Sequence, residues 1–245
     1  MTTTAAPPIP TSTRAPGSVN PRRTAFVAGA FYLLTFASSI PAVFFLAPVL
    51  DDPGYVTGAG ADTRVVLGLL LDVVNVVALI GTAVALFPLL KRQSEGLALG
   101  FVTSRVMEGA VIMVGVASLL AVVTLRQDGA AAGAGDDGLV VAAQSLVAVR
   151  DWTLLLGPGL AAAVNALLLG TLMYRSGLVP RAIPVIGLIG APLLLASVIA
   201  TLFGIHGQFS QTALVIALPI MVWELSVGSW MLVKGFKPAP ILQQA

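Results

Sequence analysis

Arg105 and Glu108 are charged residues three positions apart inside a long apolar stretch, residues 97–125. In a membrane-spanning helix a charged residue costs about 2.5–3.5 kcal/mol on insertion scales. A spacing of three places both side chains on one helix face, where they can interact. Charged groups in this position seek partners inside a helix bundle, so this pair is the first candidate for a functional site.

Two further polar residues lie at matching depth in other apolar stretches. At ~1.5 Å per residue from the nearest helix end, Arg105 lies about 12 Å inward, Glu108 about 16 Å, Glu224 about 15 Å and Asn165 about 14 Å. We therefore expect these four side chains to form one inward-facing cluster, with the third and sixth spans as neighbours. One arginine cannot balance two carboxylates, so one glutamate is expected to carry a proton.

This cluster has two interpretations. A protonatable carboxyl inside a bundle can relay a proton or bind a cation or small substrate. Alternatively, an arginine–glutamate contact can simply fix the packing and register of helices. The residues alone leave both open.

A second polar set is expected nearer the outer surface. Asp72 and Asn75 lie three apart in one apolar stretch, and Arg150 and Asp151 lie at the outer end of another. An ion pair between Asp72 and Arg150 is one interpretation, and an outer vestibule is the other.

Composition excludes several kinds of site. The chain has no cysteine, which excludes disulfides, thiolate catalysis and iron–sulfur clusters. It has one histidine, His206, expected to be a solvated loop residue, so a multi-histidine metal or haem site within one chain is excluded. Neither an HExxH motif, a G-x-S-type serine motif nor a nucleotide-binding glycine loop occurs. We therefore expect a non-enzymatic protein without a metal or cofactor.

The elements that position these residues are membrane helices. The chain is 57% hydrophobic and 10% charged, with a mean hydropathy of +0.97, whereas soluble domains carry about 25% charged residues. This composition predicts an all-α bundle of six transmembrane helices over residues 22–237, between a disordered cytoplasmic tail at 1–21 and a cytoplasmic tail at 238–245. The expected spans are 25–50, 64–90, 97–125, 149–174, 182–203 and 211–233.

Proline and glycine mark the expected irregularities. Pro41 and Pro48 should kink the first span or end it early. Gly157-Pro158-Gly159 should break or bend the fourth span. Residues 126–138, rich in Gly, Ala and Asp, are expected to form a loop without regular structure. Residues 139–148 form either a helical turn or two at the outer surface or an overhang of the fourth span.

Basic residues predict the orientation of the bundle. The tails and turns on one side hold nine of them, and the other side holds only Arg64 and Arg126. Positively charged loops face the cytoplasm, so both termini should be cytoplasmic, in a multi-pass protein of the inner or plasma membrane. Because these residues fall at helix ends and form no surface stripe, nucleic-acid binding is not expected. The nine are Arg14, Arg22, Arg23, Lys91, Arg92, Arg175, Arg181, Lys234 and Lys237.

Four stretches together resemble the bacterial domain of unknown function 4386 family. They are RTAFVAGAFYLLTF (23–36), LALGFVTSRVMEG (97–109), LLGPGLAAAVNALLLGTLMYRSGLVPR (155–181) and PIMVWELSVGSWMLVKGF (219–236). The resemblance covers roughly residues 22–237. It implies a multi-pass membrane protein and supplies no catalytic residue.

Two functions therefore stay open. The protein is either a small permease or ion- or proton-coupled carrier that uses the intramembrane cluster, or a structural or regulatory membrane protein that binds lipid or partner proteins. A water-filled cavity reaching Glu108 and Glu224 would favour the carrier, and a dry, closed network would favour the structural role. The lipid bilayer is the one partner expected in either case, and the oligomeric state cannot be read from the sequence.

Overall fold

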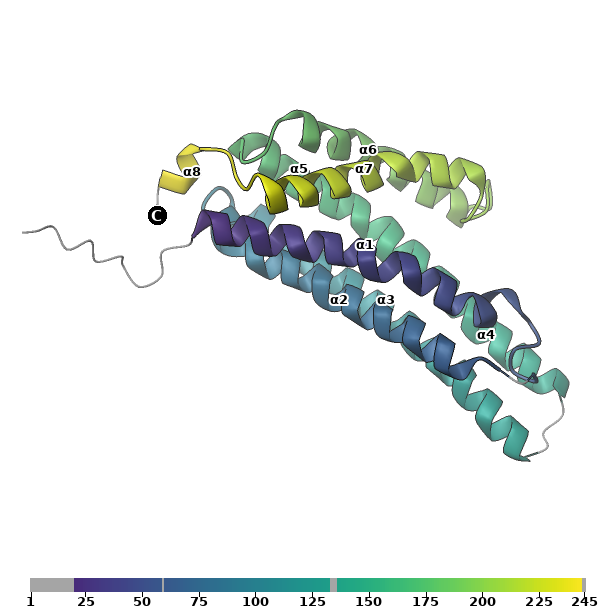
Figure 1. Cartoon of the computed structure of the whole chain (residues 1–245). Coiled ribbons are helices and arrows are strands. Elements are labelled where there is room, and N and C mark those ends of the chain that lie inside the picture. Colours follow the sequence, from purple (N-terminus) through teal and green to yellow (C-terminus); the bar gives the residue numbers. More distant parts are fainter. Residues whose placement is uncertain (1–19, 59, 133–135, 244–245) are drawn as a thin grey trace, which may run out of the picture.

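The fold is a bundle of helices, shown in Figure 1. The computed structural model describes residues 20–58, 60–132 and 136–243, so most of the expected tail at 1–21 lies outside the described residues. Six helices are long and apolar enough to cross a membrane, which confirms the predicted all-α, six-span class. The elements are α1 Pro21–Asp51, α2 Asp62–Leu90, α3 Glu95–Ala132, α4 Asp136–Leu154, the π-helix η1 Leu155–Ala161, α5 Ala162–Ser176, α6 Ala182–Leu202, α7 Gln211–Val233 and the single turn α8 Pro240–Gln243.

The six spans form a closed ring, in which α4, η1 and α5 together make the fourth. Each span packs against the next one in the chain, and α7 returns to pack against α1. The terminal end of the bundle holds the start of α1, the turn at 91–94, the loop at 177–181 and α8 (Figure 1). The far end holds the loops at 52–61 and 203–210.

Helix α1 continues through both of its prolines, so of the two expected alternatives, a kink or an early end, the early end does not occur. Pro48 has no N–H to donate to the carbonyl of Phe44, one turn earlier, and an unsatisfied carbonyl is costly in a bilayer. The guanidinium of Arg64, at the start of α2, donates to that carbonyl over 2.6 Å. This contact replaces the missing donor.

The fourth span is also continuous. Gly157-Pro158-Gly159 lies inside η1, where the chain widens into a π-helix and does not break. Residues 139–148 belong to α4, so of the two alternatives the structure has the overhang that extends the span. A π-helical turn inside an α-helix frequently accompanies a functional site.

The expectation of an irregular loop at 126–138 is wrong for most of that segment. Helix α3 runs on to Ala132, and α4 begins at Asp136. In the extension, Arg126 pairs with Asp62 at the start of α2, and Asp62 also accepts from Gln127 over 2.9 Å and from the Tyr55 hydroxyl over 2.6 Å. Burial, reinforced by Asp62, raises the pKa of Tyr55 above its usual range. These contacts fasten the 52–58 loop to the far end.

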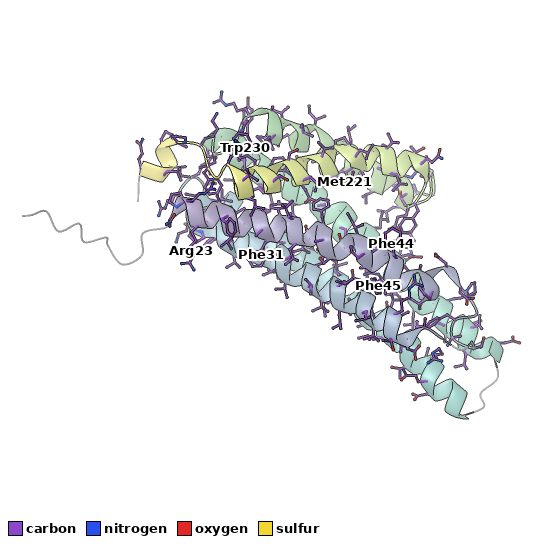
Figure 2. The ribbon with its side chains drawn as sticks, in the orientation of Figure 1. Arg23, Phe31, Phe44, Phe45, Met221 and Trp230 are labelled. Carbon is purple, nitrogen blue, oxygen red and sulfur yellow. The ribbon has the colours of Figure 1, made fainter. Side chains whose placement is uncertain are left out.

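The spans differ in length, and the bundle opens at its far end. The 38 residues of α3 extend about 57 Å and the 21 residues of α6 about 32 Å, at ~1.5 Å per residue. Figure 1 shows the α6–α7 hairpin diverging from α1 and α4 towards that end. The loop at its tip exposes Phe203, Ile205 and Phe209, and Figure 2 shows Phe44 projecting from α1 in the same region.

Small residues hold α1 and α7 together nearer the terminal end. A Cβ added at Gly29 would lie 2.5 Å from the backbone nitrogen of Leu232 and 2.7 Å from the carbonyl oxygen of Gly228. A Cβ at Gly228 would lie 2.8 Å from the Cβ of Tyr32. The two backbones therefore touch where only glycine fits, which is a common means of close packing in membranes.

The expected C-terminal tail folds back onto the terminal end. The backbone N–H of Lys237 donates to the carbonyl of Leu178 over 2.8 Å. Ala239 and Ile241 are buried and join the hydrophobic core formed by the spans. The segment after α7 thus packs against the loop between α5 and α6.

Candidate functional site

The four predicted residues of the first cluster lie together in the middle of the ring. The Arg105 guanidinium on α3 donates to Glu108 over 3.1 Å and to Glu224 on α7 over 3.1 Å. The amide of Asn165 on α5 donates to the same Glu108 oxygen, Oε2, over 2.7 Å. Three spans therefore contribute to one chain of charge-assisted hydrogen bonds.

Tyr32 on α1 is a fifth member that the sequence reasoning missed. Its hydroxyl accepts from Arg105 over 2.9 Å, and the guanidinium lies 5.2 Å from the centre of its ring. A signal was available, because Tyr32 lies about 14 Å from Arg23 at ~1.5 Å per residue, the same depth as the other members. We call Tyr32, Arg105, Glu108, Asn165 and Glu224 the Arg105 cluster.

The glycine contact between α1 and α7 explains how the cluster closes. Glu224 lies one helical turn before Gly228, and Gly228 touches Tyr32. The close approach of these two helices therefore brings the Glu224 carboxylate and the Tyr32 hydroxyl to the same guanidinium. On α3, residues 105 and 108 share a face, as their spacing predicts.

The expectation that the third and sixth spans are neighbours holds only for the side chains. The main neighbours of α7 are α6 and α1, while those of α3 are α2 and the fourth span. Arg105 reaches Glu224 across the centre of the ring because its side chain is long. Counting residues from the helix ends predicted the depth of each residue in the membrane correctly. It did not predict the order of the helices around the ring.

The Arg105 cluster is closed to its surroundings except at Glu224. The side chains of Arg105 and Glu108 are 3% and 4% exposed, and that of Glu224 is 18% exposed. The ring of Phe101 covers the guanidinium, 5.7 Å away. Such a buried, mutually paired network can hold helices together, and a proton or ion could approach it only at Glu224.

The second polar set forms the predicted ion pair. Arg150 on α4 donates to Asp72 on α2 over 2.5 Å, and both side chains are buried. Gly115 on α3 makes room for it, because a Cβ there would lie 2.9 Å from Arg150 Cδ and Nη1. Asn75 is buried one turn further along α2.

A cavity of about 270 Å³ lies beside this ion pair, in the opening between the α6–α7 hairpin and the other spans. Its wall is mostly apolar and includes Pro158 of η1 and Phe209 of the hairpin loop. Three buried polar residues, Asp72, Asn75 and Arg150, also line it. We call this cavity the Arg150 pocket. Its volume is close to the lower end of the range for ligand sites.

Asp151, the last member of the outer polar set, and the single histidine both lie apart from this pocket. Asp151 is half-buried and lines two other cavities at the far end, one next to the 52–56 loop and one next to the α6–α7 loop. His206 lies in the loop between α6 and α7, as expected, but it is only partly exposed. Its ring lies 3.4 Å from Ser197 Oγ and 3.2 Å from Thr201 Oγ1. These contacts tie the hairpin loop to α6.

Fold and site together define a six-span helical membrane protein with two buried ion networks. A family model described as Domain of unknown function (DUF4386) matches residues 27–235, and the chain belongs to this family. The family resemblance of its sequence motifs is thereby confirmed. No curated protein and no solved structure matches the chain.

Proposed function

We propose that this integral membrane protein is a non-enzymatic lipid-binding protein, and that the Arg105 cluster serves helix packing. The observation that carries the packing role is the near-complete burial of that cluster. Arg105 is surrounded by Tyr32, Glu108, Glu224 and the ring of Phe101, and its side chain is 3% exposed. A group that binds and releases ions needs access to water, whereas a packing group needs only its partners.

The position of the Arg150 pocket supports the lipid-binding part. The pocket opens where the α6–α7 hairpin diverges from α1, and Ile40, Val43 and Phe209 at its edge are exposed on the apolar surface. A membrane protein surrounded by lipid at this surface can admit a lipid molecule sideways. This arrangement favours a ligand that arrives from the bilayer.

The cell membrane, with both termini in the cytoplasm, is the proposed setting. The terminal end carries Arg22, Arg23, Lys91, Arg92, Arg175 and Arg181. Basic loops are retained on the cytoplasmic side during insertion. The far end carries Asp51, Asp52 and Asp62 with few basic residues, as expected for the outer side.

A proton- or ion-coupled carrier is the second candidate, and one observation favours it. The Glu224 side chain is 18% exposed, more than its partners. It is therefore the member of the Arg105 cluster that a proton or cation would reach first. On this interpretation Glu108, paired with Asn165 and Arg105, would receive the proton or cation next.

Flux measurements distinguish the two candidates. Protein reconstituted into vesicles that contain a pH-sensitive dye is exposed to a pH gradient, with and without Na⁺ or K⁺, beside empty vesicles. We expect wild type and Glu108→Gln to leak protons no faster than empty vesicles, while co-purified lipid is retained by both. A wild-type flux above that of empty vesicles that is lost in Glu108→Gln at equal protein abundance would overturn the proposal.

A further inference from the structure

The Arg150 pocket is lined by three buried polar side chains whose hydrogen-bonding capacity is partly unused. Asp72 accepts one bond from Arg150 Nη2. Within the described residues, Arg150 Nε and Nη1 and the side-chain oxygen of Asn75 have no hydrogen-bond partner. Buried polar groups without partners reduce stability and are uncommon in native proteins. These atoms are themselves shielded within the packed protein. A polar ligand head towards which the Asn75 and Arg150 side chains turn would supply the missing partners and remove this cost.

The polar groups specify the chemistry of that head. The N–H groups of Arg150 need an acceptor, and the amide oxygen of Asn75 needs a donor. A hydroxyl beside an ester or a second hydroxyl offers both within a few atoms. The head therefore needs to be small and to carry hydroxyl groups.

Charge balance selects a neutral head. The positive charge of Arg150 is already compensated by Asp72, and Asp151 lies next to Arg150 in the chain. An anionic head would add an uncompensated negative charge, and a cationic head would meet Arg150 directly. Burying an unpaired charge is strongly unfavourable. Fatty acids in their ionised form are therefore poor candidates.

The apolar wall specifies the rest of the ligand. The Arg150 pocket continues into a second cavity of about 280 Å³ between η1, α6 and α7, and Val43, Leu154, Pro158 and Phe209 line both. That second cavity is lined chiefly by apolar side chains, among them Leu194, Val198 and Leu214. The shared residues place the two cavities side by side, so the alkyl chain of a ligand whose head lies in the first can extend along the apolar wall of the second.

We propose that the Arg150 pocket binds a neutral, hydroxylated single-chain amphiphile of the monoacylglycerol class, with its glycerol head at Asn75 and Arg150. The proposal rests on the lipid-binding function proposed above and names the ligand class and site. The π-helix η1 contributes Pro158 to the wall, which gives this irregular segment of the fourth span a role in shaping the pocket.

Photolabelling in vesicles tests the site. The probe is a monoacylglycerol with a photoreactive diazirine in its chain, added to reconstituted full-length protein. We expect labelled peptides from α1 around residues 39–46 and from residues 154–158. Unlabelled monolauroylglycerol should compete at a concentration at least about tenfold lower than laurate, the charged analogue of equal chain length. Equal competition by laurate, or labels spread over all lipid-facing surfaces, would overturn the proposal.

Three variants localise the binding. Val43→Trp should close the mouth of the Arg150 pocket and reduce labelling by about tenfold or more. Val77→Trp, at a valine of α2 that is similarly exposed (59% against 63%), is the matched control and should label as wild type. Asn75→Leu should reduce labelling by about tenfold while the thermal midpoint stays equal or rises, since an unpartnered buried oxygen is removed. Unchanged labelling in Val43→Trp and Asn75→Leu would contradict the assignment.

The outcome is separable from that of the flux experiment. Ion flux that depends on Glu108 would overturn the proposed function while selective labelling of the Arg150 pocket still stood. Absent labelling together with vesicles that leak no protons would overturn the ligand assignment and leave the packing role of the Arg105 cluster intact.

Discussion

Arg105 on α3 and Glu224 on α7 form an ion pair over 3.1 Å although their helices are not main neighbours in the ring. The pair spans the centre of the bundle, where α1 supplies Tyr32 and α5 supplies Asn165. Side chains from four of the six spans therefore meet at one guanidinium and its carboxylate partners. Loss of this contact affects the closure of the ring and not one helix interface alone.

Arg105→Gln should strongly destabilise the protein. The substitution leaves Glu108 and Glu224 close together without their shared cation, and breaking a buried ion pair by removing one partner typically costs about 3–5 kcal/mol. The thermal midpoint of the purified protein in detergent should fall accordingly. The measurement is loss of monodisperse protein on heating, followed by size-exclusion chromatography.

The matched control removes all three charges. Arg105→Gln/Glu108→Gln/Glu224→Gln retains polar side chains of similar shape and leaves no unpaired charge, so we expect it to recover most of the lost stability. If the triple variant were less stable than Arg105→Gln alone, the charges would not be compensating one another as the structure indicates.

Gly29→Ala should separate α1 from α7. Its new Cβ would lie 2.5 Å from the backbone nitrogen of Leu232, and a backbone atom cannot give way as a side chain can. Gly100→Ala is the control, since its Cβ would meet only the Leu168 side chain at 3.6 Å. Alanine is the better helix former by about 0.5–1 kcal/mol. We expect a lower thermal midpoint for Gly29→Ala and an unchanged or higher one for Gly100→Ala.

Tyr55 should resist ionisation. Burial and the hydrogen bond to Asp62 raise its pKa above the usual value of about 10. The neutral hydroxyl is the form that the folded protein favours. Its contribution to stability is therefore complete below the unfolded pKa and is lost as the pH rises through the folded one. Phenolate absorbance of wild type minus that of Tyr55→Phe should appear at higher pH in the folded protein than in denaturant. Equal titration in both states would contradict burial of this hydroxyl.

Single cysteines can establish the orientation, because the chain has none of its own. Gly96 at the terminal end and Gly207 at the far end both lie in open surroundings, so cysteine fits at either. We expect a membrane-impermeant maleimide to label Gly207→Cys in intact cells and Gly96→Cys only after permeabilisation. The reverse pattern would place the terminal end outside.

The sequence was most informative about the depth at which each polar residue lies in the membrane. Apolar length defined the six spans, and counting residues from the basic ends placed Arg105, Glu108, Glu224 and Asn165 at one level. The same count says nothing of lateral position. It therefore could not predict that α1 and α6, and not α3, adjoin α7. Tyr32 was not predicted as a member of the cluster, because a tyrosine in an apolar stretch costs little to insert into a membrane. It therefore does not stand out in the sequence as a charged residue does.

The far end was harder to predict from the sequence. The segment 126–138 mixes alanine, the strongest helix former, with glycine and aspartate, which form helices poorly. Its local sequence was therefore ambiguous, and tertiary contacts decided the outcome for residues 126–132. Arg126 and Asp62 are 64 positions apart, and nothing in their local sequence links them. The Arg150 pocket depends on the divergence of the α6–α7 hairpin, a property of helix packing that no local pattern encodes.

The closure of the ring by its first and last spans has a consequence for biosynthesis. Glu224 is synthesised 119 residues after Arg105, which corresponds to about 6–24 s of translation at ~5–20 residues per second. During that interval Glu108 is the carboxylate already available to Arg105, and α1 has no α7 to pack against. The nascent protein therefore lies in the membrane with an incomplete Arg105 cluster. The native bundle can assemble only after α7 has been synthesised.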